Sequence, residues 1–241
     1  MAAPVLIFGA TGGIGEALAR RLSARGTPLF LSARSEDRLS RLAQDLGAGH
    51  EAVDVLNGSI EQVVMRAAGA EGLAGLAYCV GSIVLKPLSR TTPDDFLDAF
   101  RLNTLGAATT IRAAHKALAA ASGSIVLFST VAVAQGFTSH AVISAAKGGV
   151  EGLTRALAAE FAPKVRVNAI APSLVQTPLA AAITSNDALA KGIAQLHAVP
   201  RLGEPEDIAA VAAFLLGKES SWITGQVIAV DGGRSRVRTK G

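Results

Sequence analysis

Three glycines near the start of the chain have the spacing of a phosphate-binding turn. Gly9, Gly13 and Gly15 follow an apolar run and open a helical pattern that continues at Leu18 and Leu22. Glycines between a buried strand and a helix allow a tight turn and let the backbone approach a pyrophosphate, which the first N–H groups of the helix would bind. An ordinary glycine-rich turn is the alternative, because glycine spacing alone is a weak signal. The residues expected at a dinucleotide site here are Gly9, Thr11, Gly13, Ile14 and Gly15.

The end of the second apolar run indicates which dinucleotide would bind. An acidic side chain at this point would bind the ribose 2′-hydroxyl of NAD. This chain instead has Ser32-Ala33-Arg34-Ser35, with no carboxylate before Glu36. Arg34 could pair with a 2′-phosphate through charge-assisted hydrogen bonds, which favours NADP(H) over NAD(H) as the cofactor. A solvated loop charge is the alternative for Arg34.

The third apolar run ends in a residue pair that could contact an adenine ring. Asp54 precedes Val55 at the expected end of this strand. The Asp54 carboxylate could accept a hydrogen bond from the adenine amino group. It could equally cap the loop that follows, because Asp side chains often bind nearby backbone N–H groups.

The elements that must position these residues alternate along the whole chain. Short apolar runs, each bounded by Gly, Pro or Ser, predict strands near residues 4–9, 28–32, 51–55, 73–80, 124–129, 165–171 and 225–230. Helical patterns lie between them. One has Leu39, Leu42 and Leu46 at helical spacing, with Ser35 as a candidate N-cap and Gly47 as a stop. Near-continuous apolar strands alternating with helices predict an α/β fold whose parallel sheet is covered on both faces. No linker or repeat divides residues 1–241, so one domain is expected.

Composition narrows the classes of function. Aromatic residues make up 4% of the chain, which argues against base-stacking nucleic-acid modules. The longest apolar stretches, such as 73–85, are too short to span a bilayer. The single cysteine, Cys79, fits a reducing cytoplasm. We therefore expect a cytoplasmic protein that binds no metal, membrane or nucleic acid. The basic tail, residues 234–241, is expected to be solvated; its charges are Arg234, Arg236, Arg238 and Lys240.

An ordered set of segments over essentially the whole chain resembles the short-chain dehydrogenase/reductase family. After the glycine turn and the Asp54-Val55 pair come RLNTLG, SIVLFSTVA, AAKGGVEGLTRALAAE, VRVNAIAPSLVQT, RLGEPEDIA and WITGQVIAVDGG. The resemblance implies a Rossmann-like, doubly wound sheet of about seven strands and a homotetramer. It also implies hydride transfer between a nicotinamide cofactor and a small-molecule carbonyl or alcohol.

Carried over position by position, the resemblance gives a mixed active site. Asn103 and Lys147 match the family's water-relay asparagine and ribose-binding lysine, and Thr130, beside Ser129, falls at its serine. The family's tyrosine position is Ile143, which cannot donate a proton. The resemblance adds Gly81, Pro172 and Thr177 to the cofactor site, although Ser173 replaces a glycine. The only tyrosine, Tyr78, is expected on the fourth strand, near the adenosine side.

A histidine could replace the missing tyrosine. If a helix begins near residue 139, with Ser139 as a candidate N-cap, then His140, Ile143 and Lys147 share one face. An imidazole is a competent acid at neutral pH, so His140 joins Asn103, Thr130 and Lys147 as a catalytic candidate. An inert residue near the pocket mouth is the alternative for His140. His197, in the expected substrate lid 178–200, and His115 are weaker candidates.

Two functions remain open from the sequence. One is an NAD(P)(H)-dependent short-chain oxidoreductase that acts on a small apolar carbonyl or alcohol, with a non-standard or missing proton donor. The other is a catalytically silent, cofactor-binding protein that senses redox state or supports an active relative in a mixed oligomer. Leu174, Leu179, residues 180–182 and Ile183 predict an apolar substrate pocket.

Overall fold

The protein is built on one parallel sheet with helices on both faces, as the computed structural model describes for residues 2–238. The strand order is β3-β2-β1-β4-β5-β6-β7, and every neighbouring pair is parallel. The order reverses between β1 and β4, which makes the sheet doubly wound and opens a crevice at the carboxyl ends of its strands. The strands are β1 (Val5–Phe8), β2 (Leu29–Ala33), β3 (Gly49–Ala52), β4 (Gly75–Tyr78), β5 (Ser124–Phe128), β6 (Arg166–Pro172) and β7 (Val227–Val230).

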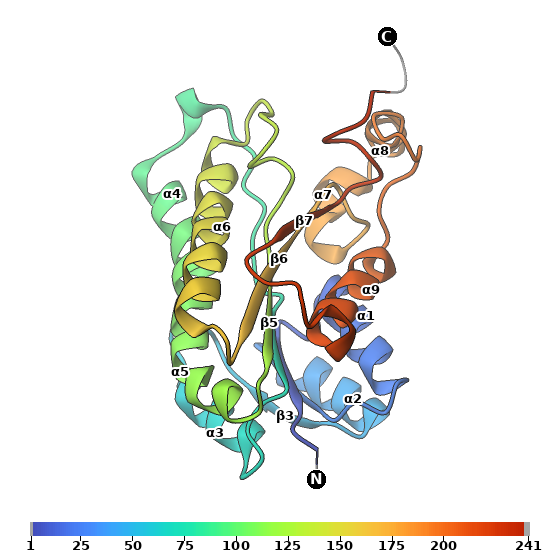
Figure 1. The fold of residues 1–241 in the computed structure, drawn as a ribbon. Helices are drawn as coiled ribbons and strands as arrows, with labels where there is room; N and C mark the ends of the chain where they lie inside the picture. Colours follow the sequence, from blue (N-terminus) through green and yellow to red (C-terminus); the bar gives the residue numbers. More distant parts are fainter. Residues whose placement is uncertain (1, 239–241) are drawn as a thin grey trace.

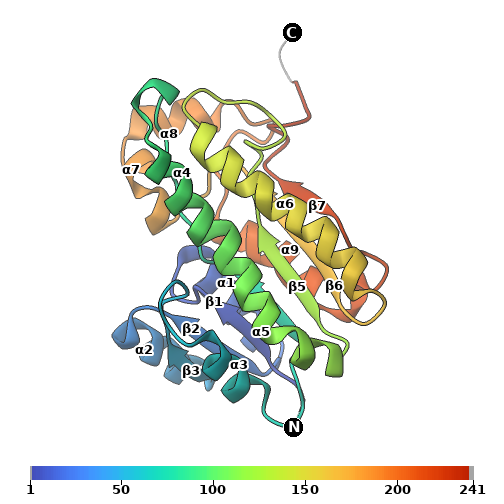
Figure 2. The same cartoon turned by 90° about the vertical axis from the view of Figure 1, so that its left-hand side faces the viewer.

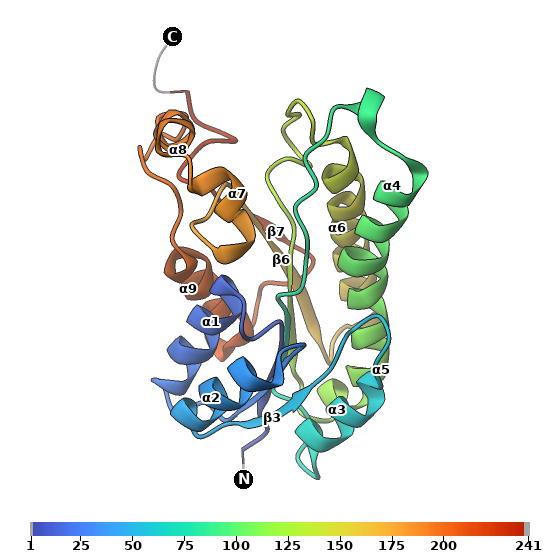
Figure 3. The same cartoon turned by 180° about the vertical axis from the view of Figure 1, so that it is seen from behind.

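The helices form two layers (Figures 1 and 3). One face carries α1 (Gly13–Ser23), α2 (Glu36–Leu46) and α9 (Pro205–Leu216). The other carries α3 (Ile60–Ala68), α4 (Pro93–Phe100), α5 (Gly106–Ala120) and α6 (Ala141–Phe161), seen face-on in Figure 2. Two short helices, α7 (Ala181–Thr184) and α8 (Asp187–Ala194), lie above the carboxyl ends of the strands. None of the helices within residues 2–238 is both long and apolar enough to cross a bilayer.

Alternation along each strand divides the apolar residues between two cores. On β1, Val5 and Ile7 pack in the core beneath α1, α2 and α9, whereas Leu6 and Phe8 pack in the core beneath α3, α5 and α6. Successive side chains of a strand point to opposite faces, so a strand buried on both faces is apolar at nearly every position. This requirement explains the unbroken apolar runs in the sequence. The expected fold class is confirmed.

Local sequence signals mark the ends of helix α2, whereas strand β3 begins and ends earlier than predicted. Helix α2 starts after Ser35 and ends at Gly47, whose φ of +61° is the left-handed conformation that glycine adopts without strain. Strand β3 covers Gly49–Ala52 rather than the predicted 51–55. The reason is a turn at Asp54, which accepts N–H bonds from Leu56 on its side chain at 2.9 Å and from Gly58 on its carbonyl at 2.7 Å. These bonds compete with strand pairing.

Candidate active site

The glycine turn between β1 and α1 is shaped by close backbone contacts. Gly9 has φ +75°, and a side chain there would lie 2.9 Å from the carbonyl carbon of Cys79. A side chain at Gly15 would collide with the carbonyl oxygen of Gly9. Gly12 is the N-cap of α1 and no side chain caps the helix, so its first N–H groups are free to bind an anion. The turn therefore fits a pyrophosphate.

Four of the predicted cofactor residues lie around this turn. A side chain at Gly13 would lie 2.8 Å from Cγ2 of Thr177, so the segment after β6 closes directly over the start of α1. Ile14 lines the main cavity together with Pro172 and Thr177. The glycine turn and the cavity are thus continuous, because the same helix start borders both.

Arg34 is the first residue beyond β2 and its side chain is exposed. Its guanidinium has no ion-pair or hydrogen-bond partner within residues 2–238. Arg34 therefore places an unpaired positive charge at the end of the second strand, where it is accessible to an anion. Asp54 lies beyond the end of β3, where its carboxylate binds the Leu56 N–H, which is the loop-capping alternative. Val55 beside it is buried.

A cavity of about 520 Å³ lies at the carboxyl ends of β4, β5 and β6, beneath α7 and α8. Its wall is mostly apolar and includes Leu174, Leu179 and Ile183, as the sequence predicted. Gly81, Thr130, His140, Ile143 and Lys147 also line it. The cavity therefore brings together most of the residues predicted for catalysis.

Helix α6 carries the residue pair that defines the chemistry of this cavity. Lys147 is buried, with 8% of its surface exposed, and its Nζ donates a hydrogen bond to the carbonyl oxygen of Phe128 at 2.8 Å. Burial lowers the pKa of Lys147 to about 8, with Cys79 opposing the shift. Burial also raises the pKa of the Cys79 thiol to about 12, so that group is neutral at physiological pH. One turn earlier, Ile143 presents a hydrocarbon side chain to the same cavity.

Asn103 supports the floor of the site from a break in the helix between α4 and α5. Residues Arg101–Leu105 form a π-helix, a distortion that often marks functional positions. The Asn103 side chain donates to the Ser82 hydroxyl at 3.0 Å and to the Ala99 carbonyl at 2.8 Å. A side chain at Gly81 would lie 2.9 Å from Oδ1 of Asn103 and 3.2 Å from Nζ of Lys147. A side chain at this position would therefore displace one or both of these polar groups.

The two hydroxyls after β5 have different roles. Ser129 donates a hydrogen bond to Oε1 of Glu151 at 2.8 Å, and this bond occupies its proton. Thr130 lines the cavity, and its oxygen accepts the N–H of Ala132 at 3.3 Å. The Thr130 proton remains free to bind a substrate oxygen. The geometry therefore favours Thr130 over Ser129.

The histidines are arranged differently from the sequence expectation. Helix α6 begins at Ala141 with His140 as its N-cap, and Ser139 adopts φ +65°, so the expected start near 139 and the Ser139 cap are wrong. His140 therefore precedes the helical face of Ile143 and Lys147. It lies at the rim of the cavity with Nδ1 2.7 Å from the carbonyl oxygen of Thr138.

The other two candidate histidines are occupied elsewhere. His197 is buried, with Nδ1 2.9 Å from the Ile193 carbonyl oxygen and Nε2 2.9 Å from the Ser173 hydroxyl. His197 lines a smaller neighbouring cavity rather than the main one. His115 on α5 stacks on Phe161 with ring centroids 4.1 Å apart. Neither of them lines the main cavity.

Tyr78 is buried and does not line the main cavity. It packs in the core beneath α5, and its hydroxyl donates to the carbonyl oxygen of Leu102 at 2.8 Å. Burial, with a smaller contribution from Asp54, raises its phenol pKa above the usual value. The alternation of side chains along β4 directs it away from the cavity that receives Cys79.

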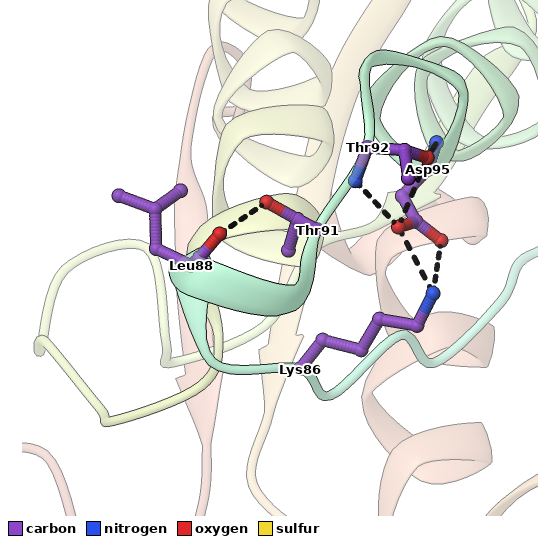
Figure 4. A network of polar contacts seen from close by, with 5 residues as sticks. All are labelled: Lys86, Leu88, Thr91, Thr92 and Asp95. Atoms are coloured by element: carbon purple, nitrogen blue, oxygen red, sulfur yellow. Dashed lines mark hydrogen bonds and ion pairs between the residues drawn. The ribbon is translucent and has the colours of Figure 1, made fainter.

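The segment between β4 and α4 forms one wall of the cavity and is anchored at two points, the first of which Figure 4 shows. The ammonium of Lys86 contacts the two carboxylate oxygens of Asp95 at 2.7 and 2.9 Å, and Asp95 also accepts the N–H of Thr92. The hydrogen bond from Lys86 is the main reason that the pKa of Asp95 is lowered. The backbone N–H of Lys86 donates to the Ser139 carbonyl at 3.0 Å, which fixes this wall beside the His140 rim.

Among the cavity residues that the sequence analysis placed elsewhere, Arg234 carries a charge. Arg234 was expected in a solvated tail, but it is half-buried and lines the cavity. Its guanidinium lies 4.6 Å from the centre of the Phe137 ring. Arg236 and Arg238 are exposed, as expected, and the last residues of the predicted tail, 239–241 with Lys240, lie outside the described residues.

Comparisons with known proteins agree with this geometry. A family profile described as enoyl-(acyl carrier protein) reductase matches residues 9–235. A 3-oxoacyl-(acyl-carrier-protein) reductase of Bos taurus is 36% identical over 240 residues, covering 94% of this chain and 95% of that protein. A short-chain type dehydrogenase/reductase from Mycobacterium ulcerans has a TM-score of 0.88 at 30% identity, over 99% of this chain and 92% of the other. An actinorhodin polyketide ketoreductase with NADPH has a TM-score of 0.90 at 27% identity, and the match covers 98% of this chain and 100% of the ketoreductase.

Proposed function

The chain belongs to the short-chain dehydrogenase/reductase family, and from this membership we propose an NADP(H)-dependent oxidoreductase without the family's usual proton donor. Its substrate is a small apolar carbonyl compound or the corresponding alcohol. One observation carries the proposal. Thr130, Ile143 and Lys147 line a single apolar cavity that is continuous with a glycine turn suited to a pyrophosphate.

The cofactor side of the site is proposed from the residues around the turn. The backbone of Gly9, Thr11, Gly13, Ile14 and Gly15 would hold the pyrophosphate. Beyond it, Arg34 would bind the 2′-phosphate, Lys147 the ribose near the nicotinamide, and Thr177 the carboxamide. The named NADPH of the related polyketide ketoreductase supports the NADP(H) preference. When bound, the nicotinamide would supply or accept a hydride.

The substrate side requires a hydrogen-bond donor and a proton source. The free proton of Thr130 would bind the carbonyl oxygen and orient the carbonyl carbon toward the nicotinamide. Ile143 stands where the family's tyrosine is expected, so no phenol supplies a proton. His140 is the proposed substitute acid. Its Nδ1 is within hydrogen-bond distance of the Thr138 carbonyl, which holds a proton on Nδ1. The imidazolium form would carry a second proton on Nε2 and donate it to the substrate oxygen, which leaves the neutral imidazole.

The proposal extends to the assembly and location of the protein. We propose one domain over residues 1–241, with 178–200 as a lid over the cavity and a homotetramer as the active form. Trp222 supports association, because its side chain is 99% exposed beside the edge strand β7. A single cysteine supports a reducing, cytoplasmic location.

A second function is favoured by Ile143 itself. The cavity keeps the proposed cofactor residues but has no tyrosine hydroxyl to donate a proton. This combination also suits a catalytically silent protein that binds NADP(H). Such a protein would sense the redox state of the nicotinamide or support an active relative in a mixed oligomer. The two functions predict the same cofactor binding and differ only in turnover.

The test is NADPH consumption by the purified protein against a panel of aliphatic ketones. The oxidoreductase predicts consumption that depends on the ketone and is lost in Lys147→Met. Cofactor binding without turnover on any ketone would favour the silent protein. Absence of cofactor binding would reject both.

A further inference from the structure

The main cavity contains a cation that the proposed reaction does not use. No Asp or Glu side chain lines this cavity within residues 2–238. Its lysine and arginine are Lys147, on the nicotinamide side, and Arg234, from the segment after β7. Leu179, Ile183 and Ile193 of the lid region supply apolar wall in the same cavity. The cavity is therefore apolar, free of negative charge, and carries positive charge from two separate elements.

A hydrogen-bonded turn holds Arg234 at this position. The carboxylate of Asp231 accepts the N–H groups of Gly233 at 2.9 Å and Ser235 at 2.8 Å. The N–H of Arg234 donates to the carbonyl of Asp231 at 3.1 Å. Both carboxylate oxygens of Asp231 are thus used by the backbone. Figure 1 shows this segment passing beside α8, whose Leu189 and Ile193 line the same cavity.

The guanidinium of Arg234 is left without an anionic partner. It makes no ion pair or hydrogen bond within residues 2–238, and Asp231 acts on it only at longer range. Burial lowers its pKa, against the opposing effect of Asp231, but a guanidinium stays charged at any working pH. The guanidinium lies over the ring of Phe137, which is itself 5.3 Å from the ring of His140. Stacking on an aromatic face restrains the guanidinium and leaves its edge open to a ligand.

We propose that Arg234 binds a carboxylate of the substrate, so that the substrate class is an apolar keto acid or hydroxy acid. The reacting carbonyl lies at Thr130 and the carboxylate at Arg234. An aliphatic chain between them contacts the lid leucines and isoleucines. A guanidinium suits this role because its planar fork matches the two oxygens of a carboxylate. The reaction assigned to the substrate rests on the proposed function, whereas the carboxylate site itself does not.

Binding measured without turnover tests the carboxylate site separately from the proposed oxidoreductase activity. Decanoate and its neutral counterpart decanamide are titrated by calorimetry into the cofactor-free protein. The variants are Arg234→Gln, Arg234→Lys and the matched control Arg236→Gln, which removes an exposed charge two residues along the same segment. Lys147→Met tests the other cation. The thermal midpoint of each variant reports on folding.

The proposal predicts that Arg234→Gln weakens decanoate binding about 10-fold, the low end for a charged hydrogen bond at a half-exposed site. Decanamide binding should change less than about 2-fold on the same scale. Arg234→Lys should keep part of the preference for decanoate, and Arg236→Gln should keep all of it. Equal binding of decanoate and decanamide by the unmodified protein would overturn the proposal. So would a loss of decanoate binding in Lys147→Met but not in Arg234→Gln.

Failure of the proposed function has a different signature. If the protein neither binds NADPH nor reduces ketones, but decanoate binding depends on Arg234, the oxidoreductase fails and the carboxylate site stands. If ketones are reduced and a keto acid shows no advantage in kcat/KM over its methyl ester, the carboxylate site fails alone.

Discussion

Replacing Ile143 with tyrosine should create or greatly increase ketone reduction. Ile143 lines the cavity with 5% of its surface exposed, one helical turn before Lys147. A phenol at this position would point into a space of about 520 Å³. Below pH of about 8, where Lys147 carries its charge, the ammonium would lower the phenol pKa and make the hydroxyl a better acid.

The size of the gain follows from the role of a general acid. A positioned proton donor contributes about 10²- to 10⁴-fold to the rate, or roughly 3–5.5 kcal/mol in the barrier. A larger side chain in a packed wall can cost about 1–3 kcal/mol of folding stability, although the adjoining cavity offers room for the ring. We therefore expect kcat to rise about 100-fold or more. NADPH affinity should not change, because Ile143 is not among the proposed cofactor contacts.

The assay is NADPH-dependent reduction of aliphatic ketones by the unmodified protein, Ile143→Tyr and the control Ile143→Phe. The phenylalanine variant adds the same ring without the hydroxyl, so it separates proton donation from repacking. An equal gain in both variants would refute the reasoning. Unmodified protein that already matches Ile143→Tyr would also refute it, because another group would then donate the proton at full efficiency.

Three further predictions address the neighbouring residues. His140→Ala should lower any reductase activity of the unmodified protein at least 10-fold and leave Ile143→Tyr nearly unaffected, whereas an unchanged rate would remove His140 as the acid. Lys147→Met should raise stability at pH 7, because the native pKa of about 8 lies below the unfolded value of 10.5 and burying the charge costs free energy. The free energy of unfolding of the unmodified protein should rise by about 3 kcal/mol between pH 8 and pH 10.5. In urea unfolding, the greater stability of Lys147→Met should therefore shrink toward pH 10.5. A stability difference that stays constant over this pH range would contradict the lowered pKa. Light scattering should give a mass above that of the monomer, and Trp222→Ser should lower it without changing the thermal midpoint of the monomer. A monomeric unmodified protein would reject the assembly.

The fold was predictable because strands buried on both faces of a parallel sheet appear in the sequence as short, nearly continuous apolar runs. Strand β1 is apolar at every position and β5 at every position except Ser124, so the runs 4–9 and 124–129 stand out. The glycine turn was predictable for a related reason. The backbone contacts at Gly9 and Gly15 exclude any side chain, and this requirement is visible as residue type.

The π-helix and the cavity position of Arg234 involve contacts between distant segments, and no local sequence pattern predicts such contacts. Nothing in RLNTLG distinguishes a π-helix from an α-helix, and the side-chain bond from Asn103 to Ser82 joins residues 21 positions apart. The cavity position of Arg234 depends on the turn at Asp231 and on the ring of Phe137. An Asp followed by two glycines was the available signal for that turn.

An error of two residues in the predicted start of α6 also changed the inferred position of a candidate proton donor, His140. The expectation that His140 shares a helical face with Lys147 required a helix start near 139. The left-handed backbone at Ser139 instead makes His140 the N-cap of α6. Histidine placement therefore could not be derived from periodicity, because the cap residue lies outside the helical repeat.

The central claim is an NADP(H) site, and direct cofactor titration tests it most directly. NADPH and NADH are titrated into the unmodified protein and into Arg34→Ala, with nicotinamide fluorescence as the signal. The account predicts that NADPH binds more tightly than NADH. Arg34→Ala should weaken NADPH by about 1–2 kcal/mol, or roughly 5- to 30-fold, because the guanidinium is exposed, and should leave NADH nearly unchanged. Tighter binding of NADH, equal losses for both cofactors in Arg34→Ala, or no binding of either would contradict it.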